Sequence, residues 1–221
     1  MRFSTIKIMI VAAFVAVFGV GVFAQDVAMT RAEWEKVLTT LNKASEGMSF
    51  RQSAVVEEVI DGVPSPEKTR QEILEEVPPD RTRQIGTVII NGEVERTEWI
   101  TIGDRSWTRT NNGRWSIDNS GRSGDDRAAI VAAEGYSSKG KAVLAGVEYR
   151  IYEKAERLTV QRSGVIGREN QFATTIIWID RDGLCIREFY KLEFPNTKYI
   201  YRRTATNEYN PKDLKIEAPM K

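Results

Sequence analysis

Residues 174–192, TTIIWIDRDGLCIREFYKL, decide the fold that we predict for this chain. They begin with the β-branched and aromatic residues 176–179, pass through the turn-forming residues 180–183, and end with apolar residues mostly at every second position. The first and last of these patterns are typical of strands, and Asp and Gly are typical of tight turns. The segment therefore predicts a β-hairpin with one apolar face.

Most of the remaining chain also has the pattern of short strands joined by tight turns. The dipeptide Asn91-Gly92 is among the strongest hairpin signals, because a type I′ turn needs positive φ at both central positions. Segment 67–77 is rich in Glu and Gln, which favours a helix, but its length and the prolines around it favour a strand, which we expect. The predicted strands span residues 49–60, 67–77, 81–90, 93–102, 105–110, 114–117, 146–153, 158–162, 172–179, 184–193, 197–204 and 214–217.

One amphipathic helix is predicted at residues 31–46, after a loose lead at residues 25–29. Thr30 and Glu33 have the spacing of a capping box, and Gly47 follows as a C-terminal cap. Apolar residues recur at the spacing of one helical face, at Trp34, Val37, Leu38 and Leu41. A helix packed on an antiparallel sheet gives the fold class α+β.

A second helical segment is predicted at residues 125–134, DDRAAIVAAE, where two leading Asp residues suit the positive end of a helix dipole. Residues 136–145 are expected to form a loop or another short helix. The whole stretch 118–145 is long for a connection without strands, and such insertions often act as lids or binding loops. A lid is therefore one interpretation of this stretch.

The N-terminus has the features of a Sec-type signal peptide. Arg2 and Lys7 precede an apolar run at residues 8–23, and Val22 and Ala24 place small residues three and one before a cleavage site. A transmembrane anchor is the alternative, but the run is shorter than the roughly 20 apolar residues that span a bilayer. We expect removal of residues 1–24 near Ala24. No Cys acceptor for a lipid anchor follows, so residues 25–221 are expected to be one soluble, secreted domain.

The composition argues against several classes of function. The 32 Lys and Arg are interspersed with 31 Asp and Glu, so nothing favours binding to nucleic acid. The chain has no His and only Cys185, which excludes Ser-His-Asp and Cys-His catalysis and leaves a packed thiol as the simplest role for the cysteine. Asp180 and Asp182 are too few for a calcium loop, and nucleotide-binding and G-x-S-x-G motifs are missing. We expect no catalytic residues, no metal and no cofactor.

An apolar cavity remains as the candidate site. Ordinary core packing explains aromatic and aliphatic residues on strands, but a highly curved sheet covered by few helices encloses more apolar surface than those helices can fill. Such a sheet keeps a cavity that can hold an acyl chain. The candidate lining residues are Trp34, Leu38, Leu41, Phe50, Trp99, Trp107, Ile130, Tyr149, Ile177, Ile186, Tyr190 and Tyr201.

The hairpin at residues 174–192, the following KYIY at 198–201 and the LKIEAP at 214–219 resemble the closing strands of the outer-membrane lipoprotein carrier superfamily. This superfamily includes the LolA-like carriers and the LppX-like mycobacterial lipid-binding lipoproteins. The resemblance extends over nearly the whole length after residue 24. It implies a highly curved antiparallel sheet, an unclosed β-barrel wrapped over one or more helices, and a hollow for lipid or lipoprotein acyl chains in the periplasm.

We therefore expect a non-catalytic periplasmic carrier or binding protein for lipid or lipoprotein acyl chains. Its partners would be a lipid or an acylated protein, and an envelope protein, and we expect a monomer. The first alternative is a periplasmic protein-interaction or envelope-stress sensor module on the same fold. The second is a hydrolase with two converging carboxylates, for instance Glu188 facing Asp126.

Overall fold

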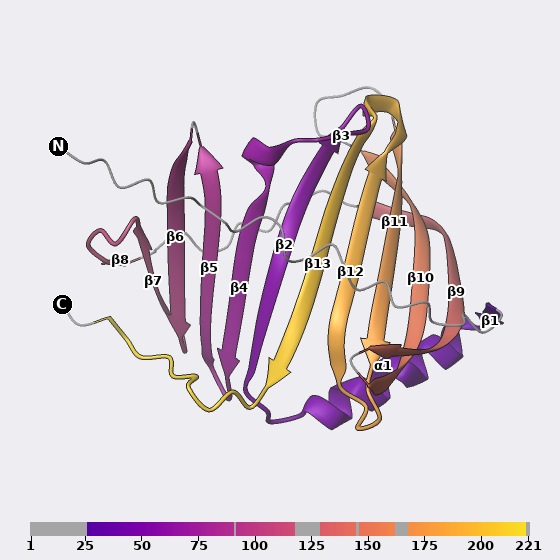
Figure 1. Ribbon diagram of the computed structural model, residues 1–221, viewed down its shortest axis with the longest axis horizontal. Coiled ribbons are helices and arrows are strands. Elements are labelled where there is room, and N and C mark those ends of the chain that lie inside the picture. The colour runs from indigo at the N-terminus through magenta and orange to yellow at the C-terminus, as the bar shows by residue number, and fades with distance from the viewer. Residues whose placement is uncertain (1–25, 91, 118–128, 145, 162–167, 220–221) are drawn as a thin grey trace.

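The computed structural model describes residues 26–90, 92–117, 129–144, 146–161 and 168–219. Within these ranges the chain forms a thirteen-stranded sheet and the single α-helix α1, Arg31–Ser45 (Figure 1). The sheet is antiparallel, strongly curved and unclosed, as the sequence predicts. The predicted signal peptide, residues 1–24, lies outside the described residues and stays a prediction.

The strands follow the order β1-β9-β10-β11-β12-β13-β2-β4-β5-β6-β7-β8, and β3 pairs with β2 off this path. Among the described strands, β1 and β8 end the path and do not pair with each other, which leaves the barrel open. The bounds are β1 Val27–Met29, β2 Phe50–Ile60, β3 Val63–Pro64, β4 Arg70–Val77, β5 Arg81–Ile90, β6 Glu93–Ile102, β7 Arg105–Thr110, β8 Ser116–Ile117, β9 Ala129–Leu144, β10 Val147–Gln161, β11 Arg168–Ile179, β12 Cys185–Phe194 and β13 Tyr199–Tyr209. Two short 3₁₀ turns, Pro66–Lys68 and Pro195–Thr197, complete the described elements.

The hairpin predicted from residues 174–192 is confirmed as β11 and β12. Asp180 Oδ1 accepts hydrogen bonds from the backbone N–H groups of Asp182 and Leu184, both at 2.9 Å, which closes the turn. Gly183 has φ +87°, a left-handed conformation that glycine adopts without steric cost. The chain therefore reverses here by local chemistry that its sequence specifies.

Helix α1 also begins as predicted. Thr30 Oγ1 accepts from the Glu33 N–H at 3.3 Å, and the Glu33 carboxylate accepts from the Thr30 N–H at 2.7 Å, which is a complete capping box. Trp34 is only 5% exposed and packs with Ile177, Ile179 and Cys185 in the core beneath the helix. The helix thereby covers the ends of β10 to β12 next to the β11–β12 turn (Figure 1).

The predicted helix at 125–134 is wrong for the residues that can be compared. Residues 125–128 lie outside the described ranges, but 129–134 belong to strand β9, which continues through the segment predicted as loop or short helix. Ala, Gly and Ser leave local propensity weak here, and antiparallel pairing with β10 on one side and β1 on the other decides the conformation. The described part of the expected lid is therefore sheet.

Three smaller predictions also need correction. Residues 154–157, left unassigned by the sequence, continue β10 as one strand, and the lead before the helix forms the edge strand β1. Residues 214–217 form no strand. This segment is instead attached to the sheet by two arginine side chains. Ile216 is 2% exposed, and its carbonyl accepts a hydrogen bond from Arg81 at 3.0 Å. The preceding Asp213 accepts one from Arg51 at 3.0 Å.

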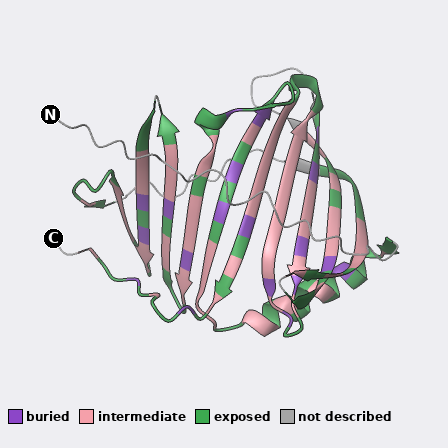
Figure 2. Ribbon diagram, in the orientation of Figure 1, coloured by how far each residue is buried: buried purple, intermediate pink, exposed green. Residues whose placement is uncertain are grey.

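The side chains on the two faces of the sheet are stabilised in different ways. We call the face that α1 packs on the inner face and the opposite one the outer face. Directly paired residues of neighbouring strands share a face, which assigns each strand residue to one of the two. On the outer face, a charge ladder crosses five strands through Arg51, Glu75, Arg83, Glu98 and Arg109. Most strand residues are half-buried and few are fully buried, because much of the sheet is a single layer (Figure 2).

Candidate ligand pocket between the helix and the sheet

A pocket of about 560 Å³ lies between α1 and the inner face of the sheet. Its volume falls within the range of about 300–1,000 Å³ that is typical of small-molecule sites. The lining residues come from the helix, from the connection to β2 and from β2, β4 and β11 to β13. They are Trp34, Leu38, Leu41, Ser45, Gly47, Met48, Phe50, Gln52, Glu76, Pro78, Thr175, Ile177, Cys185, Glu188, Asn207 and Tyr209.

The helix contributes one stripe of side chains to this pocket. Trp34, Leu38, Leu41 and Ser45 follow one another at spacings of four, three and four, which places them on one helical face. Trp34 is buried at the β11–β12 end, whereas Leu38 remains 37% exposed. The apolar face of the helix is therefore wider than the sheet surface that covers it, and the pocket occupies the remainder.

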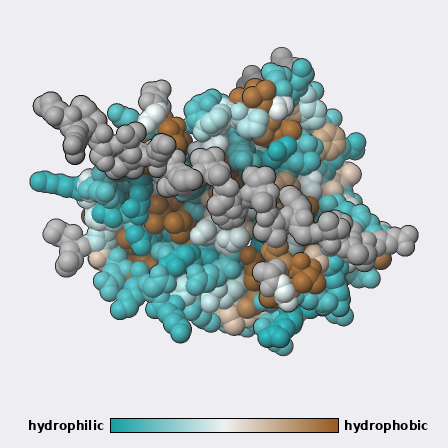
Figure 3. All heavy atoms as spheres, viewed as in Figure 1, coloured by the Kyte–Doolittle hydropathy of each residue, from teal (hydrophilic) through white to brown (hydrophobic). Residues whose placement is uncertain are grey.

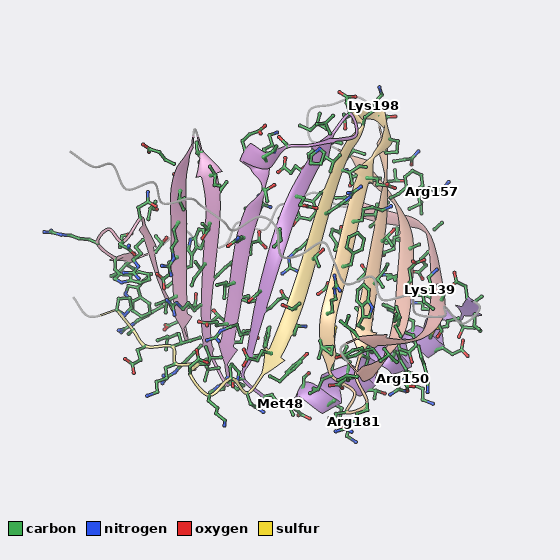
Figure 4. All side chains as sticks on the ribbon, in the orientation of Figure 1. Met48, Lys139, Arg150, Arg157, Arg181 and Lys198 are labelled. Atoms are coloured by element: carbon green, nitrogen blue, oxygen red, sulfur yellow. The ribbon has the colours of Figure 1, made fainter. Side chains whose placement is uncertain are left out.

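The sheet contributes side chains in rows across neighbouring strands. One row runs from Glu76 through Phe50 to Tyr209, which are directly paired in register. Another pairs Glu188 with Ile177. The pocket lies at the edge of the sheet where Met48 and the β11–β12 turn with Arg181 are found, opposite the edge with Lys198 (Figure 4).

Polar side chains between these rows are held by hydrogen bonds within the protein. Tyr209 Oη and Asn207 Nδ2 both donate to the Cys185 carbonyl, at 3.0 and 2.8 Å. Gln52 Nε2 donates to Asn207 Oδ1 at 2.9 Å. This network bridges β12, β13 and β2 and fixes the floor of the pocket in one arrangement.

The potential nucleophiles of the pocket are kept neutral. Burial, with a further contribution from the Glu188 charge, raises the pKa of the Cys185 thiol to about 12. Burial likewise raises the pKa of Tyr209 to about 12. A buried neutral thiol is inert, so the packed role predicted for Cys185 fits its position.

Five of the predicted lining residues meet in the pocket: Trp34, Leu38, Leu41, Phe50 and Ile177. Three others, Trp99, Tyr190 and Tyr201, lie on the inner face by register but outside the pocket, farther from α1. The side chain of Ile130 and the acid Asp126 lie outside what the structure describes.

The remaining predicted residues lie elsewhere. Trp107 pairs with the outer-face residue Ile100. Tyr149 directly precedes Arg150, which pairs with the inner-face residue Ile179. Trp107 and Tyr149 therefore both lie on the outer face, away from the pocket. Ile186 occupies the irregularity in β12 where the register with β11 shifts. A bulge moves side chains between faces, and aromatic content alone cannot give the face of a residue.

The sequence prediction missed most of the polar lining. Gln52 follows Phe50 by two positions and Asn207 precedes Tyr209 by two, so strand alternation from either aromatic residue would have found them. Glu76 carries no such signal, because its place depends on the pairing of β4 with β2. The prediction rested on apolar side chains and therefore did not include the polar lining.

The inner face beyond the pocket is polar and aromatic. Arg203 contacts Glu72 at 3.4 Å and Glu188 at 4.0 Å, and Arg70 contacts Glu72 at 3.0 Å. The Arg70 guanidinium lies 5.9 Å from the ring centre of Tyr201. This charged network borders the apolar pocket and limits how far an aliphatic chain can extend along the inner face without desolvating charges.

A smaller pocket of about 280 Å³ lies on the other side of α1. It is lined by Met29, Glu33, Lys36, Val37, Thr40, Leu41, Arg150, Tyr152, Ile179 and Gly183. Leu41 lines both pockets, so the helix separates them.

Hydrophobic side chains also reach the surface as separate patches within a hydrophilic surround (Figure 3).

The described ranges bear on metal binding and on membrane crossing. They contain no group of three or more His, Cys, Asp or Glu residues placed to hold a metal ion. None of the helices found there has the length and apolar character needed to cross a membrane.

No family model and no curated protein matches the sequence. Solved structures with a similar fold include a LolA superfamily protein from Nitrosomonas europaea, with 7% identity, 82% of this chain and 94% of that chain covered, and a TM-score of 0.35. A putative outer membrane lipoprotein-sorting protein domain from Vibrio parahaemolyticus has 9% identity, coverages of 81% and 93%, and a TM-score of 0.36. LprF from Mycobacterium bovis has 12% identity, coverages of 85% and 97%, and a TM-score of 0.41.

One of these structures is of a protein from the superfamily that the sequence resembles. The identities and TM-scores are low, so we draw no functional conclusion from these neighbours.

Proposed function

We propose that this protein is a non-catalytic binding protein that takes the aliphatic chain of a lipid or an acylated protein into the pocket between α1 and the sheet. The observation that carries the proposal is the pocket beside Leu38, whose lining combines apolar side chains with polar ones, in a fold whose core is otherwise small. A soluble protein rarely leaves such a surface uncovered without a ligand for it.

The apolar lining supplies enough free energy for useful binding. Burial of one methylene group is worth about 0.8 kcal/mol, so a chain of a dozen methylenes gains roughly 10 kcal/mol before entropic costs. Ordering the chain and the encounter itself offset a large part of that gain. An affinity in the micromolar range is therefore a reasonable expectation for a ligand that fits the pocket.

The cellular setting is part of the same proposal. Residues 1–24 have the pattern of a Sec signal peptide, and we propose cleavage near Ala24 and release of residues 25–221 into the periplasm as one domain. A carrier in that compartment meets acyl chains of lipids and lipoproteins and passes them to an envelope partner. We expect it to work as a monomer.

The test begins with the full-length chain expressed in a bacterium and purified from the periplasm without detergent. Native mass spectrometry followed by solvent extraction detects any bound lipid, and the mass also gives the site of cleavage. We expect an acyl species in near-stoichiometric amount, or uptake of added lipid by protein that is purified empty.

A substitution links any bound chain to this pocket. Leu38→Trp places a large side chain in the space beside a residue that is already 37% exposed, so we expect the fold to persist and lipid uptake to fall at least tenfold. Val63→Trp, at a 67% exposed site on β3, is the matched control and leaves uptake unchanged. Equal uptake by both variants would refute binding at this pocket.

A protein-interaction or sensor module is the second candidate, because of one specific observation. The inner face beyond the pocket carries the Arg70, Glu72 and Arg203 network, while apolar side chains such as Val55 and Phe172 are exposed on the outer face. A surface of this kind can dock a partner without taking up lipid. An empty protein that takes up no lipid but co-purifies with one envelope protein would favour this candidate.

A further inference from the structure

We infer that the pocket between α1 and the sheet selects chains with a cationic head group, such as alkyl amines or quaternary ammonium amphiphiles, over fatty acid anions. The inference rests on the proposed function, since it specifies the ligand class for the same pocket. It follows from the charges and hydrogen-bond donors that line the pocket.

The first observation is the charge of the lining. Glu76 and Glu188 contribute carboxylates, and the described lining contains no Lys or Arg. The smaller pocket across the helix has a different composition, with Lys36 and Arg150 beside Glu33. The larger pocket thus has no cation in its lining, although Arg203 at its border contacts Glu188 at 4.0 Å and donates to Gln52.

The second observation is that several hydrogen-bond donors of the lining are already used. The single donor hydrogens of Tyr209 and Cys185 go to backbone carbonyls, at 3.0 and 3.3 Å. Ser45 Oγ donates to the Leu41 carbonyl at 3.0 Å. An anionic head group needs donors or cations, and these side chains offer it none.

Glu76 is the stronger of the two carboxylates for this role. It is half-buried at the end of β4, directly paired with Phe50, and within the described residues it forms no ion pair. Glu188 has Arg203 at 4.0 Å, and that guanidinium also contacts Glu72 at the shorter distance of 3.4 Å. A ligand cation beside Glu76 would therefore meet a carboxylate that no described side chain neutralises.

The geometry also fits an amphiphile with one chain and one charged end. Trp34, Leu38 and Phe50 surround the apolar part of the pocket, and Glu76 lies in the same row as Phe50. Aromatic rings at this junction add attraction for an ammonium group through their electron-rich faces. An aliphatic chain along α1 can thus place its head group at the β4 end.

The experiment compares three probes with the same twelve-carbon chain below their micelle concentrations. They are dodecyltrimethylammonium, the neutral 1-monolaurin and dodecanoate, each titrated by calorimetry into the periplasm-purified protein at neutral pH. We expect the ammonium probe to bind at least tenfold more tightly than dodecanoate, with monolaurin between them. A tenfold ratio corresponds to about 1.4 kcal/mol, which a pair of opposite charges at a partly exposed site can supply.

Two variants assign the preference to the pocket. Glu76→Gln removes this carboxylate, and we expect it to lower the ammonium-to-dodecanoate ratio at least threefold. Glu57→Gln makes the same change at an exposed position on the outer face of β2 and leaves the ratio as it was. Thermal melts followed by circular dichroism test whether both variants are folded. If Glu76→Gln is unstable, Glu188→Gln removes the other carboxylate of the pocket instead.

The outcomes separate this inference from the proposed function. Equal binding of all three probes, or tighter binding of dodecanoate, overturns the head-group inference and leaves chain binding intact. A preference that persists in both Glu76→Gln and Glu188→Gln also overturns it, because the charge would then lie elsewhere. Failure of every probe, including monolaurin, to bind refutes the proposed function itself.

Discussion

Replacement of Glu98 by Gln is expected to destabilise the protein by about 2–4 kcal/mol. Glu98 lies on β6, is 2% exposed, and is the central acid of the outer-face charge ladder. Arg83 donates to its Oε1 at 2.6 Å, and Arg109 donates to its Oε2 at 2.6 and 2.9 Å. A Gln side chain keeps one acceptor oxygen, so one or two charge-assisted bonds are lost, each worth about 1.5–3 kcal/mol.

The same replacement should change how stability depends on pH. Burial alone would raise the pKa of Glu98, but hydrogen bonds and charge interactions with Arg109 and Arg83 outweigh it and leave the pKa below its ordinary value of 4.5. A lowered pKa means that the stabilisation is fully present above pH 4.5 and is lost as the pH falls through the folded-state value. Glu98→Gln should therefore flatten the stability profile below pH 4.5.

Urea unfolding, followed by tryptophan fluorescence between pH 3.5 and 7, measures both effects. With a slope of about 2 kcal/mol per molar urea, the midpoint should fall by about 1–2 M at pH 7. Glu93→Gln, at an exposed position at the start of β6, is the control and should stay within about 0.5 kcal/mol of the parent. A loss below 0.5 kcal/mol for Glu98→Gln, or an unchanged pH profile, would refute the assignment of a structural role to the ladder.

Three further predictions test the helix side of the molecule. Trp34→Ala removes the largest side chain of the core beneath α1 and should cost about 3–5 kcal/mol of unfolding free energy by urea titration, whereas a cost below 1 kcal/mol would contradict its role. Cys185, whose pKa is raised to about 12, should resist a thiol reagent at pH 8 in the folded protein and react in urea; rapid labelling without urea would show that it is accessible. Gly183→Ala should lower the melting temperature, because φ is +87° and a Cβ would lie 3.3 Å from Ala44; an unchanged melting curve would count against strain at this turn.

Local patterns in the sequence predicted most of the sheet, because residues that are close together in the chain form the turns and the start of the helix. Asp180 and Gly183 close the β11–β12 turn with their own side-chain and backbone chemistry, and Thr30 with Glu33 begins α1 in the same way. Strand β4 was also predicted correctly against its helix-favouring composition, since its length and flanking prolines carried more information than residue propensity.

The errors occur where distant pairing decides the structure. Half of the residues of strand β9 are Ala, Gly or Ser, and nothing within it specifies an extended chain without β10 and β1 as neighbours. The opposite error occurs at residues 214–217, where a strand-like pattern forms no strand: Arg81 donates to the Ile216 carbonyl, and Arg51 donates to the preceding Asp213. In the pocket, the missed residue Glu76 is placed by pairing between strands that the sequence does not order.

Within the described ranges, one helix covers only part of a wide, open sheet, which explains why the pocket and the charge ladder occur in one molecule. Helix α1 covers the ends of β10 to β12 through Trp34, and its apolar stripe extends beyond them to Leu38. Strands β4 to β7 have no described helix over them, so their outer side chains are satisfied by ion pairs such as Glu98 with Arg109. The two regions meet at β2 and β4, where cover by the helix ends. The pocket is therefore at the place where the helix no longer covers the sheet, and under the proposed function a chain-like ligand would occupy it.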